Sequence, residues 1–230
     1  MNWLIVLGGG QGTRVGKKIN KVFLKINHRP IIYWTLKTAQ QCLTINKIIV
    51  VVQKKYSAII KGFGFDKISS IVEPAIGSRQ DSTAKIIDLI AHQIKSNDLI
   101  GIHNAANPFV TSQEITQVFS IAKKNQSALL AVPAIDTIKI TNNQKLTINS
   151  PLKNNCWGAQ TPQVAQFSLL QKAFQKAQKE KFQGTDDTQL ILRMGIKSKI
   201  VECSRHNFKI TYPDDLEKAR KIFKKLKIIE

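Results

Sequence analysis

The sequence predicts an α/β fold with a mostly parallel sheet, helices on both of its faces and a protruding β-arm. Two observations carry this prediction. Short apolar, β-branched runs alternate along the chain with longer stretches of helical spacing, and this alternation is typical of βαβ units. One later stretch, residues 135–160, interrupts the alternation with short strand-like pieces around a turn signal.

The expected strands are nearly continuous apolar runs, so helices should cover both of their faces. We place these strands at residues 3–7, 48–52, 70–72, 99–103, 128–132 and 199–203. Apolar residues at helical spacing predict helices over residues 31–42, 81–94, 113–123 and 167–179. A last helix is expected to begin near Pro213 and to run to Ile229, because a proline suits the first turn of a helix.

The interrupted stretch predicts a β-hairpin inserted into the α/β domain. Asn142 and Asn143 supply the turn between its alternating pieces. We therefore interpret residues 1–230 as a single domain, with residues 135–160 as the inserted β-arm. A two-stranded ribbon is marginally stable by itself, so the arm is expected to pack against a second subunit.

The composition limits the class of protein. Hydrophobic residues make up 43% of the 230 residues, which argues against a disordered chain. The first apolar run, Trp3 to Leu7, is too short to span a bilayer or to form the core of a signal peptide. Three cysteines without a C-x-x-C pair favour a reducing, cytoplasmic setting over a disulfide framework or a zinc site.

The chain is strongly basic, with 35 Lys and Arg against 15 Asp and Glu and a formal net charge of +20. Residues 1–65 hold eleven of these basic residues and no acidic one. Such a segment attracts anionic ligands, although a generally lysine-rich chain would look the same. A nucleic-acid binder is the alternative from another class of function. Against it, the sequence has no helix-turn-helix, RNP or zinc signature and only 7% aromatic residues.

The first expected strand leads into the loop Gly8-Gly9-Gly10-Gln11-Gly12-Thr13-Arg14, at the sheet edge where α/β proteins bind ligands. Glycines leave backbone N–H groups bare, and clustered N–H groups suit phosphate. The loop fits neither the G-x-x-x-x-G-K-[ST] pattern of P-loop proteins nor the G-x-G-x-x-G fingerprint of dinucleotide enzymes. What remains is two cations, Arg14 and Lys21, which either clamp a triphosphate or face solvent.

Further segments follow this loop in a fixed order. They include Ser78-Arg79-Gln80-Asp81-Ser82, His103-Asn104-Ala105-Ala106-Asn107-Pro108, Asp136-Thr137-Ile138-Lys139, Trp157-Gly158-Ala159-Gln160-Thr161-Pro162-Gln163, Gly184-Thr185-Asp186-Asp187 and Asn207-Phe208-Lys209-Ile210-Thr211. Together with the loop they resemble the 2-C-methyl-D-erythritol 4-phosphate cytidylyltransferases. The resemblance implies a Rossmann-like nucleotidyltransferase domain whose β-arm is exchanged across a homodimer. It also implies a reaction of CTP with the polyol phosphate, with Mg²⁺ as cofactor, to give a CDP-polyol and pyrophosphate.

The same resemblance implies roles for individual residues. Arg14 and Lys21 are the implied catalytic residues, which hold the triphosphate and the charge that develops on it. The implied nucleotide-binding residues are Leu7, Gly8, Gly9, Gly10, Gly12, Ser82, Asn104, Ala105 and Lys209, and the implied polyol-phosphate ligands are Thr137, Lys153 and Thr161, with Lys153 offered from the arm of the second subunit. A phosphate monoester is mostly dianionic near pH 7 and needs no general base. That suits four histidines which form no pattern with serine or cysteine.

The chain departs from the family pattern at several positions. The usual segment Asp-Ala-Ala-Arg-Pro reads Asn104-Ala105-Ala106-Asn107-Pro108, Asn20 replaces a proline, and Lys153 replaces an arginine. Asn104 is the implied metal ligand, with a neutral oxygen in place of the expected carboxylate. Three interpretations stay open: a cytidylyltransferase for methylerythritol phosphate, a sister enzyme for ribitol 5-phosphate, and an inactive homologue that still binds nucleotide.

Overall fold

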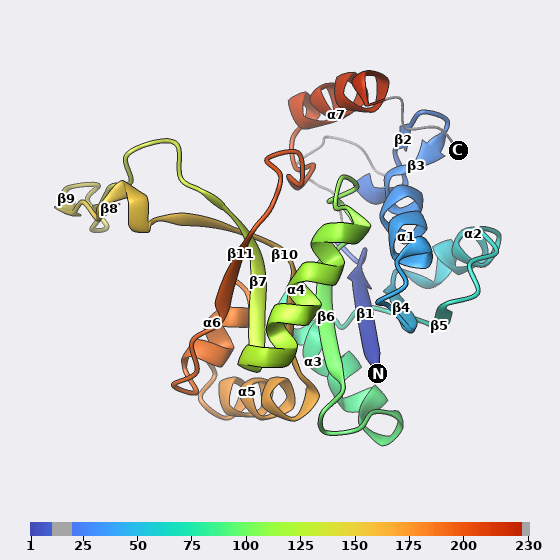
Figure 1. Cartoon of the computed structure of the whole chain (residues 1–230), viewed down its shortest axis with the longest axis horizontal. Coiled ribbons are helices and arrows are strands. Elements are labelled where there is room, and N and C mark those ends of the chain that lie inside the picture. Colours follow the sequence, from blue (N-terminus) through green and yellow to red (C-terminus); the bar gives the residue numbers. More distant parts are fainter. Residues whose placement is uncertain (11–19, 227–230) are drawn as a thin grey trace.

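A seven-stranded sheet forms the centre of the molecule (Figure 1). The computed structural model describes residues 1–10 and 20–226 of the chain. In the strand order β11-β7-β10-β6-β1-β4-β5, neighbours are parallel except at β10, which is antiparallel to both β6 and β7. This sheet confirms the predicted Rossmann-like α/β fold. The strands are β1 (Asn2–Leu7), β4 (Lys47–Val51), β5 (Ile68–Val72), β6 (Leu99–Asn104), β7 (Ser127–Pro133), β10 (Trp157–Gln166) and β11 (Lys199–Glu202).

Strand β10 differs from the sequence prediction. The sequence places residues 155–160 only in the arm, whereas β10 continues to Gln166 and lies between β6 and β7. Its pairing with β7 shifts register between Ala159 and Gln163, where Pro162 supplies no backbone N–H for the ladder. A proline and several glutamines interrupt the apolar run by which the other strands are recognised.

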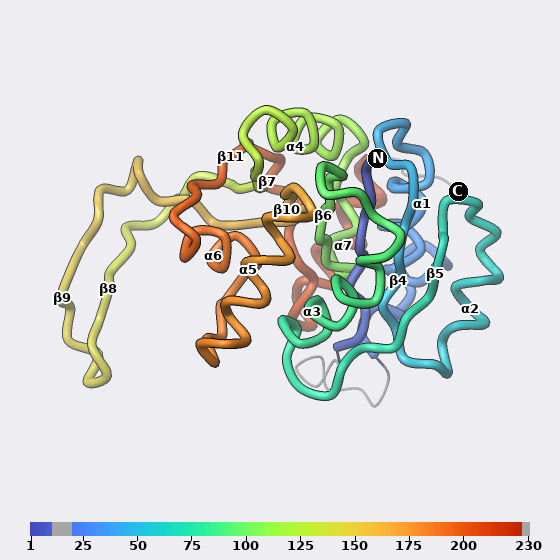
Figure 2. The backbone as a smooth tube through the Cα atoms, turned by 90° about the horizontal axis from the view of Figure 1, so that it is seen from below, coloured from blue at the N-terminus to red at the C-terminus, as the bar shows by residue number. Residues whose placement is uncertain are grey.

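Helices cover both faces of the sheet. Leu36 and Val118 belong to a buried cluster on one face, under α1 and α4. Ile86 and Phe174 belong to a second cluster on the other face, under α3, α5 and α6. Figure 2 shows these layers, with α4 on one side of the sheet and α3 and α5 on the other. The helices are α1 (Ile31–Gln41), α2 (Ser57–Lys61), α3 (Arg79–Ile90), α4 (Ser112–Asn125), α5 (Phe167–Lys179), α6 (Asp187–Leu192) and α7 (Pro213–Lys225).

A third cluster joins the last helix to the first. Trp34 of α1 and Phe223 of α7 pack with ring centroids 4.8 Å apart, and Phe109 lies beside Phe223. Helix α7 begins at Pro213, as the sequence predicts. The short strands β2 (Lys25–Ile26) and β3 (Arg29–Pro30) form a separate antiparallel pair before α1.

Side-chain caps fix where the helices next to the sheet edge begin. In α3, Ser78 and Asp81 form a reciprocal capping box, and Thr111 and Glu114 form another at the start of α4. Such caps satisfy N–H groups that have no partner within the helix, and each is typically worth about 1 kcal/mol. The capping box at Ser78 starts α3 two residues before the predicted residue 81, which brings Arg79 into the first turn.

The hairpin β8 (Ile140–Thr141) and β9 (Thr147–Asn149) extends away from the body of the molecule (Figure 1). Asn142 forms the turn of the hairpin, because its Oδ1 accepts hydrogen bonds from the N–H groups of Gln144 and Leu146, each 3.0 Å long. Residues 135–150 are exposed along their whole length. Within the described part of the chain, no helix has both the length and the apolar character that crossing a membrane requires.

Candidate functional site

A cavity of about 650 Å³ opens at the carboxyl edge of the sheet. Three neighbouring parallel strands end at it and contribute Leu7 from β1, Val51 from β4 and Asn104 from β6. Ligands of α/β sheets bind at this edge, and small-molecule sites typically measure about 300–1,000 Å³. The described lining consists of Leu7, Gly8, Gly9, Gly10, Asn20, Lys21, Val22, Val51, Gln53, Pro74, Ala75, Ile76, Gly77, Ser78, Arg79, Ser82, Asn104, Ala106 and Lys209.

The glycines after β1 form one wall of this cavity, as the sequence predicts for Gly8, Gly9 and Gly10. The Gly8 N–H donates to the Val51 carbonyl over 2.8 Å and ties the loop to β4. A Cβ on Gly9 would lie 2.6 Å from the Cβ of Pro74, so only glycine permits this approach of the two backbones. Among the described residues, no atom lies within 4 Å of a Cβ built on Gly10. The predicted residues Gly12 and Arg14 belong to residues 11–19, which lie outside the described residues.

Lys21 lines the cavity from the short 3₁₀ helix η2 (Lys21–Phe23). The residue before it, Asn20, is buried with only 4% of its surface exposed. Its Nδ2 donates to the Gly8 carbonyl over 2.6 Å, while its Oδ1 accepts from the Val22 N–H over 3.3 Å. One side-chain amide therefore fixes the Lys21 turn to the glycine loop.

Aromatic packing supports the same turn from behind. Phe23 stacks on Tyr56 with ring centroids 3.8 Å apart. The Tyr56 hydroxyl accepts from the Asn20 N–H over 3.4 Å. Lys21 thus stands on a turn that is held at three points, so little reorganisation is needed to present its ammonium group.

The segment from Pro74 to Ser78 forms another part of the lining. The Ser82 hydroxyl braces this segment, because it accepts from the Ala75 N–H over 3.1 Å and donates to the Ser78 carbonyl over 3.3 Å. Ser82 lines the cavity, and its hydroxyl already has two partners within the loop. Its contact with a nucleotide stays a prediction. Ile76, also in the lining, has a fully exposed side chain.

Arg79 also lines the cavity, and its guanidinium is held by Asp187. Nη1 and Nη2 donate to the two carboxylate oxygens over 3.0 and 2.6 Å. Burial alone would lower the pKa of Arg79, but the Asp187 carboxylate outweighs burial and raises that pKa above its ordinary value. The pair joins the start of α3 to α6 and neutralises one of the cations in the lining.

Asn104 is the last residue of β6, and its backbone N–H joins a chain of buried polar groups. Its N–H donates to Thr161 Oγ1 over 3.2 Å, and that hydroxyl lies 2.9 Å from Nδ1 of His103. Nε2 of His103 lies 3.3 Å from the Asn107 carbonyl. Burial lowers the pKa of His103 to about 4, so the ring is neutral near pH 7. A proton on Nε2 and a lone pair on Nδ1 satisfy both contacts.

Two of the predicted site residues lie beside the cavity rather than in its wall. Thr161 is 4% exposed, and its hydroxyl is engaged by Asn104 and His103. Ala105 is fully buried, and its N–H donates to the Leu7 carbonyl over 3.0 Å. Ala106 takes its place in the lining. Both residues hold the ends of the strands that form the site.

The predicted residues Thr137 and Lys153 lie in the arm, where both are exposed. Figure 1 shows the arm directed away from β1 and β6, whose ends form the cavity. Within one chain these two side chains are therefore not brought to the cavity. Their predicted contact with a substrate phosphate requires a second copy of the chain and stays a prediction.

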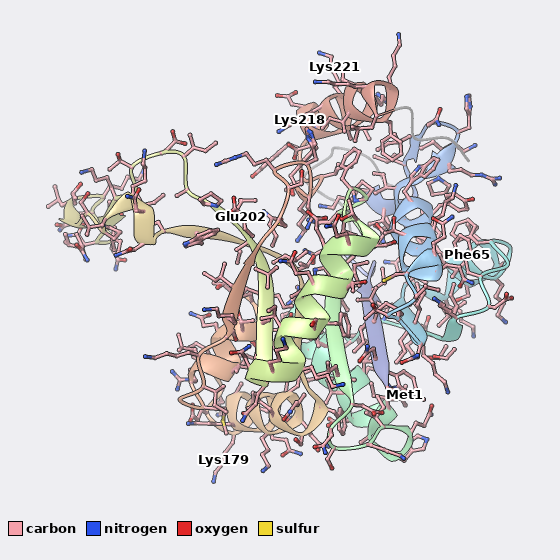
Figure 3. All side chains as sticks on the ribbon, in the orientation of Figure 1. Met1, Phe65, Lys179, Glu202, Lys218 and Lys221 are labelled. Carbon is pink, nitrogen blue, oxygen red and sulfur yellow. The ribbon has the colours of Figure 1, made fainter. Side chains whose placement is uncertain are left out.

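Much of the positive charge lies far from the cavity. Lys179 on α5 and Lys221 on α7 extend into solvent at opposite ends of the molecule (Figure 3). In the described lining the cations are Lys21, Lys209 and Arg79. Lys21 and Lys209 are both residues that the sequence predicts for binding phosphates. They give the cavity its attraction for anions.

The donor set does not fit a resident Mg²⁺ ion. The described lining contains no aspartate or glutamate, and the sequence of residues 11–19 adds none. Among the described residues, no group of three His, Cys, Asp or Glu side chains is placed to hold a metal. Mg²⁺ is usually bound through one or two carboxylates together with substrate phosphates. Asn104 stands at the predicted position but offers only a neutral oxygen.

Sequence reasoning missed several residues of the described lining, and Gln53 and Asn20 are two of them. Gln53 follows β4 and lies in the wall with Val51. A signal for it was present, because residues directly after a parallel strand reach the ligand-binding edge of the sheet. Asn20 was singled out only as a departure from the family. Its hydrogen bond to Gly8, twelve positions away, follows no local pattern.

Comparisons with known proteins identify the family to which the chain belongs. The model of the family described as "IspD: 2-C-methyl-D-erythritol 4-phosphate cytidylyltransferase" matches residues 3–225. A relative of that name from Alkaliphilus oremlandii is 33% identical over 226 residues, covering 96% of this chain and 94% of the relative. Another, from Caldanaerobacter subterraneus subsp. tengcongensis, is 34% identical over 226 residues, with coverages of 96% and 98%.

Solved structures give the same result. The crystal structure of the Francisella tularensis 2-C-methyl-D-erythritol 4-phosphate cytidylyltransferase superposes with a TM-score of 0.81 at 28% identity, over 96% of this chain and 98% of that one. The 4-diphosphocytidyl-2C-methyl-D-erythritol synthase from Anaerococcus prevotii shares the fold, with a TM-score of 0.84 at 24% identity and coverages of 97% and 96%. The chain therefore belongs to the 2-C-methyl-D-erythritol 4-phosphate cytidylyltransferase family of nucleotidyltransferases.

Proposed function

We propose that this protein transfers the cytidylyl group of CTP to 2-C-methyl-D-erythritol 4-phosphate. The products are 4-diphosphocytidyl-2-C-methyl-D-erythritol, an intermediate of the non-mevalonate isoprenoid route, and pyrophosphate. The observation that carries the proposal is the cavity at the glycine loop, which presents bare backbone, Lys21 and Lys209 and has no acidic residue in its described lining. Such a surface suits a triphosphate.

In the proposed reaction, a phosphate oxygen of the polyol phosphate attacks the α-phosphorus of CTP. A new P–O bond forms, the bond from the α-phosphorus to the α,β-bridging oxygen breaks, and pyrophosphate leaves with the electron pair. The attacking phosphate is mostly dianionic near pH 7 and needs no base. The neutral, fully buried His103 fits this account, because it is occupied by Thr161 and Asn107 and does not line the cavity.

The barrier of this reaction lies in bringing two polyanions together and stabilising the charge at the α-phosphorus. Lys21 has the position for this role, on a turn fixed to the glycine loop. Arg14 is proposed as its partner, and Lys209 as a ligand of the phosphates. Removing one such fixed donor typically costs about 3–4 kcal/mol, or roughly 10²–10³ in rate.

The proposed active form is a homodimer built through the arm. The arm exposes large apolar side chains, among them Ile135 at 66%, Ile148 at 65% and Leu152 at 75%. Several large apolar side chains exposed on one segment favour an interface there. In the dimer, Thr137 and Lys153 of the second copy would reach the polyol phosphate bound at the cavity.

Mg²⁺ is the metal that we propose for the reaction, since it is the usual companion of nucleotide phosphates. We place the reaction in the cytoplasm, because the three cysteines Cys42, Cys156 and Cys203 are all free, as a reducing compartment would keep them.

The test is pyrophosphate release from CTP, measured with one polyol phosphate at a time. Release that requires 2-C-methyl-D-erythritol 4-phosphate supports the proposal. Release only with ribitol 5-phosphate assigns the chain to the sister activity. If neither substrate gives release while CTP still raises the melting temperature, the chain is an inactive homologue. Binding to random DNA without binding of nucleotide would contradict the proposal altogether.

A further inference from the structure

We infer that this protein has no divalent-metal site of its own, and that the metal ion enters the cavity only on the phosphates of the nucleotide. The metal is then part of the substrate. The inference rests on the proposed binding of CTP, and it goes beyond it because it concerns the protein without nucleotide. It starts from the mismatch between an implied Mg²⁺ and a cavity whose described lining holds no carboxylate.

Three described carboxylates close to the lining are committed to other partners. Asp81 accepts from the N–H and the hydroxyl of Ser78 over 2.7 and 2.8 Å, as the helix cap of α3. Asp187 forms the bidentate pair with Arg79. Glu73 accepts from the Lys54 N–H over 3.0 Å on the outer side of the Pro74 segment, and none of the three acids belongs to the lining. Turning any of them toward a metal would break a cap, a buried ion pair or a loop contact.

The change at Asn104 is matched by its surroundings. Asn107, the position where the family has an arginine, is fully buried. Its Nδ2 donates to the Asn207 carbonyl over 3.1 Å and to Gln160 Oε1 over 3.2 Å. This neutral amide fills the position, so no buried cation there requires a carboxylate at residue 104. Asn104 in the described lining and the buried Asn107 behind it are therefore both neutral.

The charge of the cavity acts differently on a free divalent cation and on a metal ion that is already bound to a nucleotide. A free divalent cation meets a described lining that carries the positive charges of Lys21 and Lys209 and contains no carboxylate, and it is repelled. A nucleotide that carries its own metal still presents net negative charge to those lysines. Metal-free CTP carries more negative charge and should bind at least as well. In the ground state, the lysines therefore provide part of the charge neutralisation that a protein-bound metal would give.

The first experiment titrates Mn²⁺, as a probe for Mg²⁺, into the full-length protein without nucleotide, and measures free Mn²⁺ by electron paramagnetic resonance. Wild type should show no saturable site tighter than about 1 mM. Asn104→Asp, with its fold verified by circular dichroism, should gain affinity by about tenfold or more, because it restores an anionic ligand at the end of β6. Gln53→Glu is the matched control, since it adds the same charge elsewhere in the lining.

A stoichiometric Mn²⁺ site in wild type would overturn the inference. An equal gain in Gln53→Glu would overturn the assignment of Asn104 as the position where the ligand was lost.

The second experiment compares the melting temperature of wild type with CTP in EDTA and with CTP and Mg²⁺. At CTP near 100 times its Kd, both conditions should raise the midpoint by roughly 5–10 °C. Stabilisation that requires Mg²⁺ would contradict the inference. If CTP stabilises under neither condition, the proposed CTP binding fails, while the Mn²⁺ titration still decides whether the protein alone holds a metal.

Discussion

Asn20 offers a direct test of how the cavity is held together. Asn20→Ala removes the 2.6 Å hydrogen bond to the Gly8 carbonyl and the 3.3 Å contact with the Val22 N–H. Losing a buried partner typically costs about 1–3 kcal/mol. If this free energy is lost from the transition state because Lys21 is displaced, kcat/KM falls by roughly 5- to 150-fold. We expect the larger part in kcat, because Lys21 is assigned to the developing charge.

Two further substitutions at this position separate geometry from hydrogen bonding. Asn20→Asp keeps the shape but sets a carboxylate oxygen against the Gly8 carbonyl, and should be worse than Asn20→Ala. Asn20→Pro removes both the side-chain amide and the backbone N–H that donates to the Tyr56 hydroxyl, but its ring suits the backbone, since φ is −56° at this residue. It should recover part of the rate that Asn20→Ala loses.

Steady-state kinetics of pyrophosphate release, together with urea unfolding, measure these effects. Asn125→Ala is the matched control, because it removes a 2.9 Å amide-to-carbonyl bond at the exposed end of α4, away from the cavity. Wild-type kcat/KM in Asn20→Ala would refute the argument that this amide positions Lys21. So would a loss of the same size in Asn125→Ala.

Three other predictions concern the frame of the site. Gly9→Ala should lower the free energy of unfolding by about 1–3 kcal/mol, because the new methyl group is forced against Pro74. Gly10→Ala should leave the free energy of unfolding unchanged. Equal effects of the two substitutions in urea unfolding would contradict the close approach of Gly9 to Pro74. Asp187→Asn should cost about 3 kcal/mol in the same assay, because it leaves the Arg79 guanidinium without its buried counter-ion, and a neutral result would mean that the pair contributes nothing. Burial lowers the pKa of His103 from 6.5 to about 4, so the unfolded chain binds more protons between these values. Stability should therefore fall by up to about 3 kcal/mol as the pH drops from about 6.5 to 4, and His103→Gln should flatten that dependence; an unchanged slope would contradict it.

Periodicity and composition were sufficient for the parallel part of the fold. Strands such as β1 and β6 are nearly pure apolar runs because helices cover both of their faces, and such runs can be recognised in a sequence. Strand β10 could not be recognised from the sequence, since its central position depends on pairing with β6 and β7 around Pro162. Partners chosen by tertiary contact leave no local signal.

The site divides in the same way. Gly8, Gly9 and Lys21 follow directly from a strand and its loop, and they were predicted in the places where the cavity has them. The Arg79–Asp187 pair joins residues 108 positions apart, so no local pattern in the sequence links them. Thr161 was predicted as a ligand from its motif, but the motif does not reveal that its hydroxyl serves His103.

The central claim is that the cavity beside the glycine loop is where CTP reacts, with Lys21 stabilising the charge. The most direct measurement is pyrophosphate release from CTP with 2-C-methyl-D-erythritol 4-phosphate, in wild type, Lys21→Met and the control Lys25→Met, whose lysine is exposed on strand β2. The account predicts a fall of roughly 10²–10³ in kcat for Lys21→Met and near wild-type rates for Lys25→Met. Equal rates in Lys21→Met and wild type would contradict it.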